Sequence, residues 1–86
     1  MVVTYILYSK SINRYYVGHS VEMNERLREH NSGEGKYTKR GIPWRMVWTF
    51  ECPTRSEAML LEIKIKKRGV KRYLDDIKFR GVAQPG

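Results

Sequence analysis

The amino-acid sequence predicts an α+β domain, an α/β sandwich in which a small three-stranded antiparallel sheet is flanked by about three helices. Two runs of β-branched and aromatic residues near the N-terminus, and a third segment in which large apolar residues alternate with other residues, indicate the strands. Elsewhere the apolar spacing is close to the helical period of about 3.6. With 86 residues and no internal repeat, the chain is expected to form one domain with a modest core.

The chain opens with a predicted β-hairpin. Residues 2–8 and 14–18 are the two strand-like runs, and the polar residues between them have the composition of a tight connection. The first strand carries apolar side chains on both faces, with Val3, Tyr5 and Leu7 on one and Ile6 and Tyr8 on the other. It is therefore expected at the centre of the sheet, covered on each side. Tyr5 and Tyr16 would stand on adjacent strands, where half-buried aromatic residues are common.

A helix is predicted over residues 21–30, directly after Gly18 ends the second strand and with Ser20 as its cap. The side chains on its apolar arc are Met23, Leu27 and His30. Arg26 falls at the edge of this arc. From there its side chain either lies over the core and reaches water or reaches towards the hairpin tyrosines.

Residues 32–43 form a basic segment that contains three glycines, one proline and a single aromatic residue, Tyr37. Its cations are Lys36, Lys39 and Arg40. Such a segment suits contacts with phosphates or with an unstacked base. A plain surface loop has the same composition, so both interpretations stay open.

The second half of the chain predicts one strand followed by two helices. Residues 44–51 alternate so that one face should carry large apolar residues of the core, namely Trp44, Met46, Trp48 and Phe50. Thr54 and Glu57 have the spacing of a capping box at the start of a helix over 54–67. A last amphipathic helix is expected over 70–78, and residues 81–86 as a flexible tail beyond a domain of residues 1–80.

Glu62 is the residue of the second helix that needs an explanation, because it lies within a broad arc of apolar residues. A carboxylate carried towards the core is costly unless it finds a partner. A salt bridge, for instance to Arg26, would satisfy it, and so would a metal ion.

The charge balance indicates the kind of partner. Seventeen Lys and Arg residues against nine Asp and Glu residues give a formal net charge of +8, as expected of a small domain that binds a polymer of phosphates. An anionic membrane surface, or a basic surface without a specific partner, would give the same balance.

Membrane insertion and disulfide chemistry are not expected. No apolar run approaches the roughly 20 residues that cross a bilayer, and the N-terminus lacks the pattern of a signal peptide. Cys52 is the single cysteine, which excludes an internal disulfide and a cysteine-rich metal site. A cytoplasmic monomer without a membrane partner or a small-molecule cofactor is the expectation.

The two hairpin strands carry Val3-Thr4-Tyr5 and Tyr16-Val17-Gly18, and Arg26 and Glu62 follow in the helices. This ordered set resembles the GIY-YIG nuclease domain, most closely its small single-domain bacterial members. The resemblance covers about residues 3–67, with Val3 where the family usually has glycine.

The resemblance implies a metal-dependent endonuclease that hydrolyses phosphodiester bonds in DNA, with branched and damaged DNA among the candidate substrates. Glu62 would hold a single divalent cation, Mg²⁺ or Mn²⁺, and Arg26 would pair with phosphate oxygens. Tyr5 and Tyr16 would position the attacking water, one of them as the general base. A phenol has an ordinary pKa of about 10, so that role needs a nearby cation.

The two histidines are further candidates, because either can donate to a phosphate or transfer a proton. His30 is grouped with the catalytic residues, although it could equally be a hydrogen-bonded residue at the edge of the core. His19, which follows the YVG triplet, is grouped with Lys36, Lys39 and Arg40 as a nucleic-acid contact.

Two other functions stay open from the sequence. One is a catalytically weak or inactive nucleic-acid-binding module of the same fold. The other is a basic protein whose partner is not nucleic acid.

Overall fold

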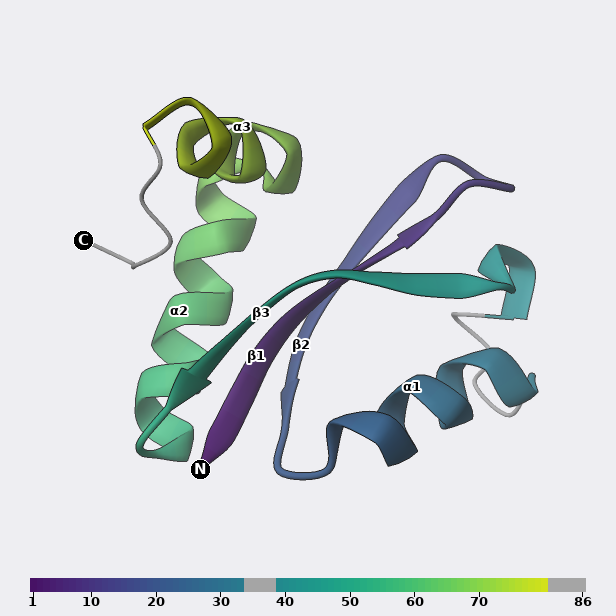
Figure 1. Cartoon of the computed structure of the whole chain (residues 1–86), viewed down its shortest axis with the longest axis horizontal. Helices are drawn as coiled ribbons and strands as arrows, with labels where there is room; N and C mark the ends of the chain where they lie inside the picture. The colour runs from purple at the N-terminus through teal and green to yellow at the C-terminus, as the bar shows by residue number, and fades with distance from the viewer. Residues whose placement is uncertain (34–38, 81–86) are drawn as a thin grey trace.

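The computed structural model describes residues 1–33 and 39–80. In chain order its elements are the strands β1 (Val2–Ser9) and β2 (Arg14–Ser20), the helix α1 (Met23–Ser32), a short 3₁₀ turn η1 (Lys39–Gly41), the strand β3 (Trp44–Cys52), and the helices α2 (Arg55–Arg68) and α3 (Val70–Arg80). The three strands pair antiparallel in the order β2–β1–β3 (Figure 1). The predicted fold class is therefore confirmed.

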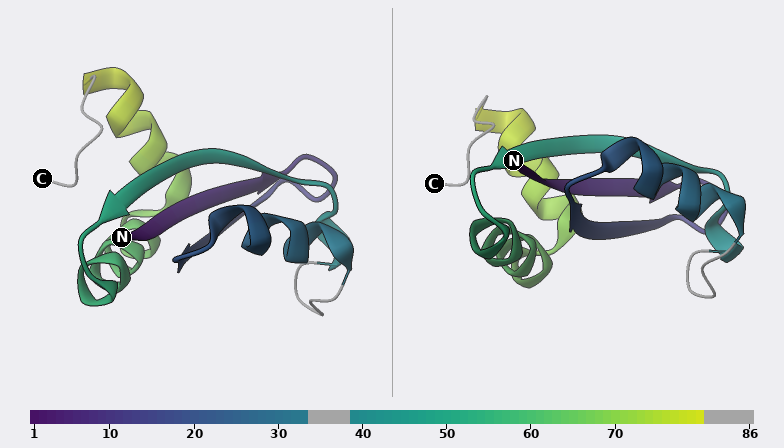
Figure 2. Two further views of the ribbon diagram at one scale, coloured as in Figure 1. Left: turned by 60° about the horizontal axis from the view of Figure 1, so that its bottom comes forward. Right: turned by 90° about the horizontal axis from the view of Figure 1, so that it is seen from below.

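The central strand β1 separates two hydrophobic clusters, as its two apolar faces predicted. Ile6 is fully buried in the cluster beneath α2 and α3. Tyr5 and Leu7, its neighbours in sequence, point to the other face and belong to the cluster beneath α1. The views in Figures 1 and 2 show α1 on one side of the sheet, apart from α2 and α3. The sheet thus separates α1 from α2 and α3. A site that contains side chains from both α1 and α2 must therefore lie at an edge of the sheet.

The strand β3 departs from the sequence prediction that its large apolar residues share one face. Ile6 pairs with Trp48, but the next residue of β1, Leu7, pairs with Met46, so Val47 is an extra residue in a β-bulge. The bulge reverses the side-chain alternation. Trp48 and Phe50 consequently pack towards α2 and α3, whereas Trp44 and Met46 pack towards α1.

The helix starts follow the prediction at α2 but not at α1. The Thr54 hydroxyl oxygen accepts a hydrogen bond of 3.2 Å from the Glu57 N–H, as the capping-box spacing predicted. Ser20, by contrast, is the last residue of β2 and not the cap of α1. Its hydroxyl oxygen accepts a 3.0 Å hydrogen bond from the N–H of Glu22, which occupies the cap position without a side-chain bond. Within the described ranges, each helix is too short or too polar to cross a bilayer.

Candidate active site

A pocket with a volume of about 460 Å³ runs along β2, an outer strand of the sheet. Successive residues of β2 point to opposite faces, so the pocket receives side chains from α1 and from α2. The residues that line it are Tyr5, Tyr15, Tyr16, Val17, Gly18, His19, Arg26, Arg55, Glu62, Lys66 and Val70. Residues from both ends of the sequence therefore meet at one place.

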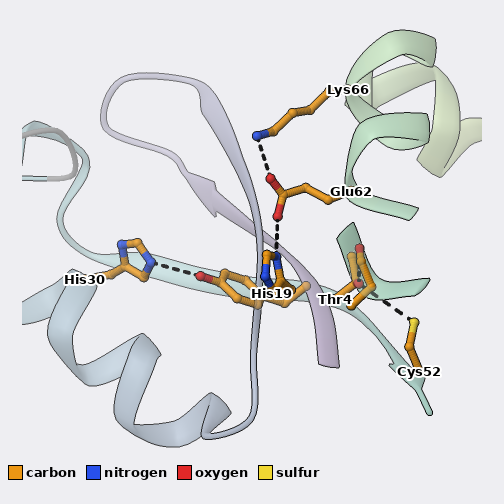
Figure 3. A network of polar contacts seen from close by, with 8 residues as sticks. Thr4, His19, His30, Cys52, Glu62 and Lys66 are labelled. Carbon is orange, nitrogen blue, oxygen red and sulfur yellow. Dashed lines mark hydrogen bonds and ion pairs between the residues drawn. The ribbon is translucent and has the colours of Figure 1, made fainter. Parts of the chain in front are cut away.

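On the α1 side, the two tyrosines named by the sequence stack on one another. The Tyr5 and Tyr16 ring centroids are 6.4 Å apart, with an angle of 23° between the ring planes. His30 joins them from α1: its ring is buried and lies edge-on to Tyr16, with ring centroids 4.6 Å apart. Its Nε2 lies 3.3 Å from the Tyr5 hydroxyl, a contact drawn as the dashed line from His30 in Figure 3. The structure thus brings Tyr5, Tyr16 and His30 together in one aromatic group.

Gly18 is the residue that lets Tyr5 reach the pocket. It is the cross-strand partner of Tyr5, and the phenol ring lies directly over its backbone. A Cβ atom at position 18 would stand 2.6 Å from the Tyr5 hydroxyl oxygen and 2.8 Å from the Cζ atom. The glycine after Tyr16-Val17 is therefore required for space.

Replacing Gly18 by Ala will push the Tyr5 ring away and break its contact with His30. Overpacking of this kind costs about 1–3 kcal/mol, which thermal or urea unfolding would register. A double-mutant cycle with Tyr5→Leu isolates the cause, because Gly18→Ala should cost much less once the ring is gone. An equal cost in both backgrounds would show that the close approach of Tyr5 is not the reason for glycine.

On the α2 side, both oxygens of the Glu62 carboxylate accept a hydrogen bond. Oε1 accepts from Nδ1 of His19 and Oε2 from Nζ of Lys66, each at 2.8 Å (Figure 3). Burial acts to raise the pKa of Glu62, but the hydrogen bonds and charges of Lys66 and His19 outweigh it and lower the pKa below its ordinary value. Glu62 is therefore ionised at neutral pH.

The salt bridge between Glu62 and Arg26 that the sequence left open is not formed. Arg26 is half-exposed on α1, where its Nη1 lies 3.3 Å from Oε2 of Glu29, and it lines the pocket from that side. The buried face of α2 is also narrower than the broad apolar arc that the sequence predicted around Glu62. The buried residues of α2 are Ala58, Leu61 and Ile65 alone, so Glu62 stands at the pocket wall.

Several site residues were missed or lie elsewhere. Lys66 was not singled out, although its position four residues after Glu62 is the spacing that favours a Glu–Lys pair on a helix. Arg55 and Tyr15 also line the pocket without a signal in the sequence. Lys39 and Arg40 are exposed on η1 and do not line this pocket, and Lys36 lies outside the described residues.

The electrostatic environment fixes the protonation of the aromatic group. Burial raises the pKa of Tyr5 well above that of a free phenol, and the neighbouring Tyr16 adds to the effect. Burial also lowers the pKa of His30, and the Arg26 charge acts in the same direction. At neutral pH a neutral imidazole therefore lies beside a protonated phenol.

The lowered pKa of His30 predicts a loss of stability in mild acid. Below the ordinary histidine pKa of about 6.5, the unfolded chain binds a proton that the folded chain refuses, so the free energy of unfolding falls as the pH decreases. The lowered pKa of Glu62 acts in a separate window: its contribution is complete above the ordinary carboxyl pKa of about 4.5 and is lost as the pH falls through the folded value.

Urea unfolding of the wild type between about pH 7.5 and 5.5 measures this effect. His30→Gln should flatten the pH dependence, whereas His19→Gln, a change of the other histidine, should retain the His30 contribution. A wild type whose stability rises towards pH 5.5, or the same slope in His30→Gln, would contradict the assignment.

Glu62 is the acidic group in this pocket that can hold a metal ion. Within residues 1–33 and 39–80, no group of three or more His, Cys, Asp or Glu side chains forms a ready-made metal cage. An ionised carboxylate offers about four lone-pair positions, of which two are used by His19 and Lys66. The donor set fits a hard, oxygen-seeking cation that keeps water and takes a phosphate oxygen as a further ligand.

Comparison with known proteins agrees with this geometry. Residues 1–73 match the model of the GIY-YIG catalytic domain. A UPF0213 protein of Halalkalibacterium halodurans is 38% identical over 63 residues, which cover 72% of this chain and 66% of the relative. The structure-specific endonuclease subunit SLX1 homologue of Brugia malayi is 33% identical over 89 residues, covering 74% of this chain and 26% of that protein.

A solved structure is also similar. The solution NMR structure of the UPF0213 protein from Bacillus halodurans superposes with a TM-score of 0.56 at 31% sequence identity, over 94% of this chain and 87% of the other. The chain spans less than two thirds of the length of the first curated relative, at 66%, and 56% of a UPF0213 protein of Streptococcus pneumoniae. The domain match over residues 1–73 extends across most of the chain, which therefore belongs to the GIY-YIG nuclease domain family.

Proposed function

We propose that this protein is an endonuclease that hydrolyses phosphodiester bonds in DNA with one divalent cation, Mg²⁺ or Mn²⁺, held by Glu62. The observation that carries the proposal is the convergence of Tyr5, Tyr16, Arg26 and Glu62, which come from β1, β2, α1 and α2, on a single pocket. A hydrolytic site needs a placed water, a proton acceptor and positive charge at the phosphate, and the pocket contains groups for each.

Glu62 and Arg26 face the phosphate from the two sides of β2. When bound at Glu62, the cation supplies Lewis-acid polarisation of the phosphate and stabilises the charge that develops in the transition state. Arg26 is half-exposed, and its pairing with Glu29 at 3.3 Å is a surface contact of small energy. Its guanidinium is thus available to donate two hydrogen bonds to non-bridging phosphate oxygens.

The aromatic group handles the proton of the attacking water. Tyr5 does not release its proton readily to solvent, because burial raises its pKa. The neutral His30 is 3.3 Å away, so its Nε2 can accept the Tyr5 proton while the phenol oxygen takes a proton from water. Tyr16, the less buried of the two stacked rings, holds the water against the phosphate.

The remaining residues either hold the Glu62 carboxylate or contact the DNA. His19 and Lys66 keep the Glu62 carboxylate ionised and oriented into the pocket. Lys39 and Arg40 are exposed cations that would contact phosphates along the strand without reading bases, and Lys36 is proposed to do the same. The SLX1 relative is a structure-specific endonuclease subunit, so DNA of particular structure is among the proposed substrates.

A plasmid-nicking assay tests the proposed function. Purified protein should convert supercoiled DNA to nicked circles in Mg²⁺ or Mn²⁺ and should not do so in excess EDTA. Nicking that is equal in EDTA would overturn the metal dependence. Salt-sensitive DNA binding without cleavage under any condition would instead identify an inactive binding module, and an absence of binding at low salt would exclude nucleic acid as the partner.

A further inference from the structure

Two tyrosines beside the pocket take no part in the proposed chemistry. Tyr8 and Tyr15 are cross-strand partners on β1 and β2, and their ring centroids are 4.9 Å apart. The Tyr8 hydroxyl donates a 2.8 Å hydrogen bond to Oδ1 of Asn13, a residue in the left-handed region with φ of 52°. The turn of the hairpin thus holds the Tyr8 ring in place, and Tyr8 in turn supports Tyr15.

Both rings are partly exposed to solvent, Tyr15 more than Tyr8. Alternation along β1 places Tyr8 on the same face as Ile6, the face under α2 and α3. The hydrophobic cluster on that face contains Ile6 and Val17 but neither Tyr8 nor Tyr15, and Tyr15 is 37% exposed. The pair, with its ring planes inclined at 46°, therefore forms a partly exposed aromatic surface at the hairpin end of the sheet, here called the aromatic shelf.

Cross-strand packing alone would explain an aromatic pair in a hairpin. Two further observations indicate a ligand. Tyr15 lines the same pocket as Glu62 and Lys66, so the shelf continues the wall of the candidate active site. In addition, the exposed Arg45 of β3 is the partner of Tyr8, which extends the row across all three strands and ends it with a cation.

A nucleotide has the chemistry that matches this arrangement. Its phosphate suits the pocket with Arg26 and Lys66, and its base suits an exposed aromatic ring, because each base has a π-face that stacks on tyrosine whatever the sequence. A base inside a duplex is already stacked between its neighbours and is not free to do so. The shelf therefore favours a nucleotide that has left the helix.

We propose that Tyr8 and Tyr15 form a stacking site for one unpaired base of the strand whose phosphate enters the pocket. This inference rests on the proposed nuclease function and defines its substrate class: DNA with unpaired nucleotides, as in single strands, flaps or bulges. Tyr15 makes the direct contact, and Tyr8 keeps its ring in position.

The test measures binding in EDTA, with gel analysis confirming that the DNA stays intact. A fluorescein-labelled single-stranded oligonucleotide and the matching duplex report affinity, and 2-aminopurine placed along the strand reports stacking by quenching. Tyr15→Leu, which keeps an apolar side chain but removes the ring, should bind the single strand roughly tenfold more weakly. Duplex binding should change much less, and the quenching should disappear.

Two matched variants control for other effects. Tyr15→Phe keeps the ring and should bind and quench as the wild type does. Ile12→Ala alters another side chain of the hairpin with similar exposure, 39%, and should leave both signals unchanged. Thermal melting of each variant checks its fold. The 2-aminopurine quenching by the wild type tests the proposal even if a variant fails to fold.

Several results would overturn the proposal. One is equal affinity of Tyr15→Leu and the wild type for the single strand. Another is a loss of affinity in Tyr15→Leu that is as large for duplex DNA as for the single strand. The third is an absence of quenching at every 2-aminopurine position in the wild type. The readout does not require cleavage. If the protein nicks DNA but no base stacks on the aromatic shelf, the stacking site is refuted and the nuclease function is retained. If a base stacks but the protein never cleaves DNA, only the nuclease function is refuted.

Discussion

Glu62→Gln will abolish metal-dependent nicking of DNA and leave the fold nearly intact. Removing the charge that holds the cation should lower the cleavage rate by at least about a thousandfold, since a bound metal supplies several kcal/mol of transition-state stabilisation. The lowered pKa of Glu62 shows that the ionised carboxylate stabilises the fold, so a small loss of stability is expected, under about 1 kcal/mol for such a partly exposed pair. Nicking and thermal melting of the same preparation measure both quantities.

Glu57→Gln is the matched control for Glu62→Gln. Glu57 lies in the first turn of the same helix, is exposed, and does not line the active-site pocket. Its replacement should hardly change nicking. A Glu62→Gln protein that nicks at the wild-type rate, or one that has lost activity because it is unfolded, would remove the reason to assign the metal to Glu62.

Arg26→Ala should lower the cleavage rate by about a hundredfold to a thousandfold, the cost of removing one donor that stabilises transition-state charge. Arg26→Lys should recover only part of this, because an ammonium group cannot pair with two phosphate oxygens as a guanidinium does. The melting temperature should stay close to that of the wild type, as the ion pair with Glu29 is exposed. Single-turnover cleavage with saturating DNA separates the chemical step from binding.

The same helix supplies a close control. Arg28 pairs with Glu25 at the same three-residue spacing at which Arg26 pairs with Glu29, but Arg28 does not line the pocket. Arg28→Ala should therefore weaken DNA binding slightly, through net charge, and leave the saturated rate unchanged. Equal loss of rate in Arg26→Ala and Arg28→Ala would indicate a general electrostatic effect and contradict a specific role for Arg26.

The strands and helices could be predicted from the sequence because their signals are local. The hairpin, the change to the helical period and the Thr54 cap depend on neighbouring residues, and the structure has each of them within a few positions of the prediction. The β-bulge at Val47 could not be predicted, since an extra residue in β3 has meaning only against the register of β1. The prediction that the large apolar residues of β3 share one face of the sheet was therefore wrong.

The site shows the same division between local and long-range information. Tyr5, Tyr16, Arg26 and Glu62 were identified through resemblance to a family motif, and the structure places all four around one pocket. The hydrogen bond between His19 and Glu62 joins residues 43 positions apart and follows from the way α2 packs across the sheet. No spacing rule in one sequence encodes such a contact.

The position of the pocket along β2 also bears on solubility. Outer strands expose unpaired backbone groups that invite pairing between molecules, and natural proteins oppose this with charged side chains beside the edge. β2 is such a strand, and Arg26, Glu62 and Lys66 provide the charges beside it. A variant with apolar residues at positions 26 and 66 should therefore aggregate as well as lose activity. A variant with glutamine at both positions should lose activity but stay in solution.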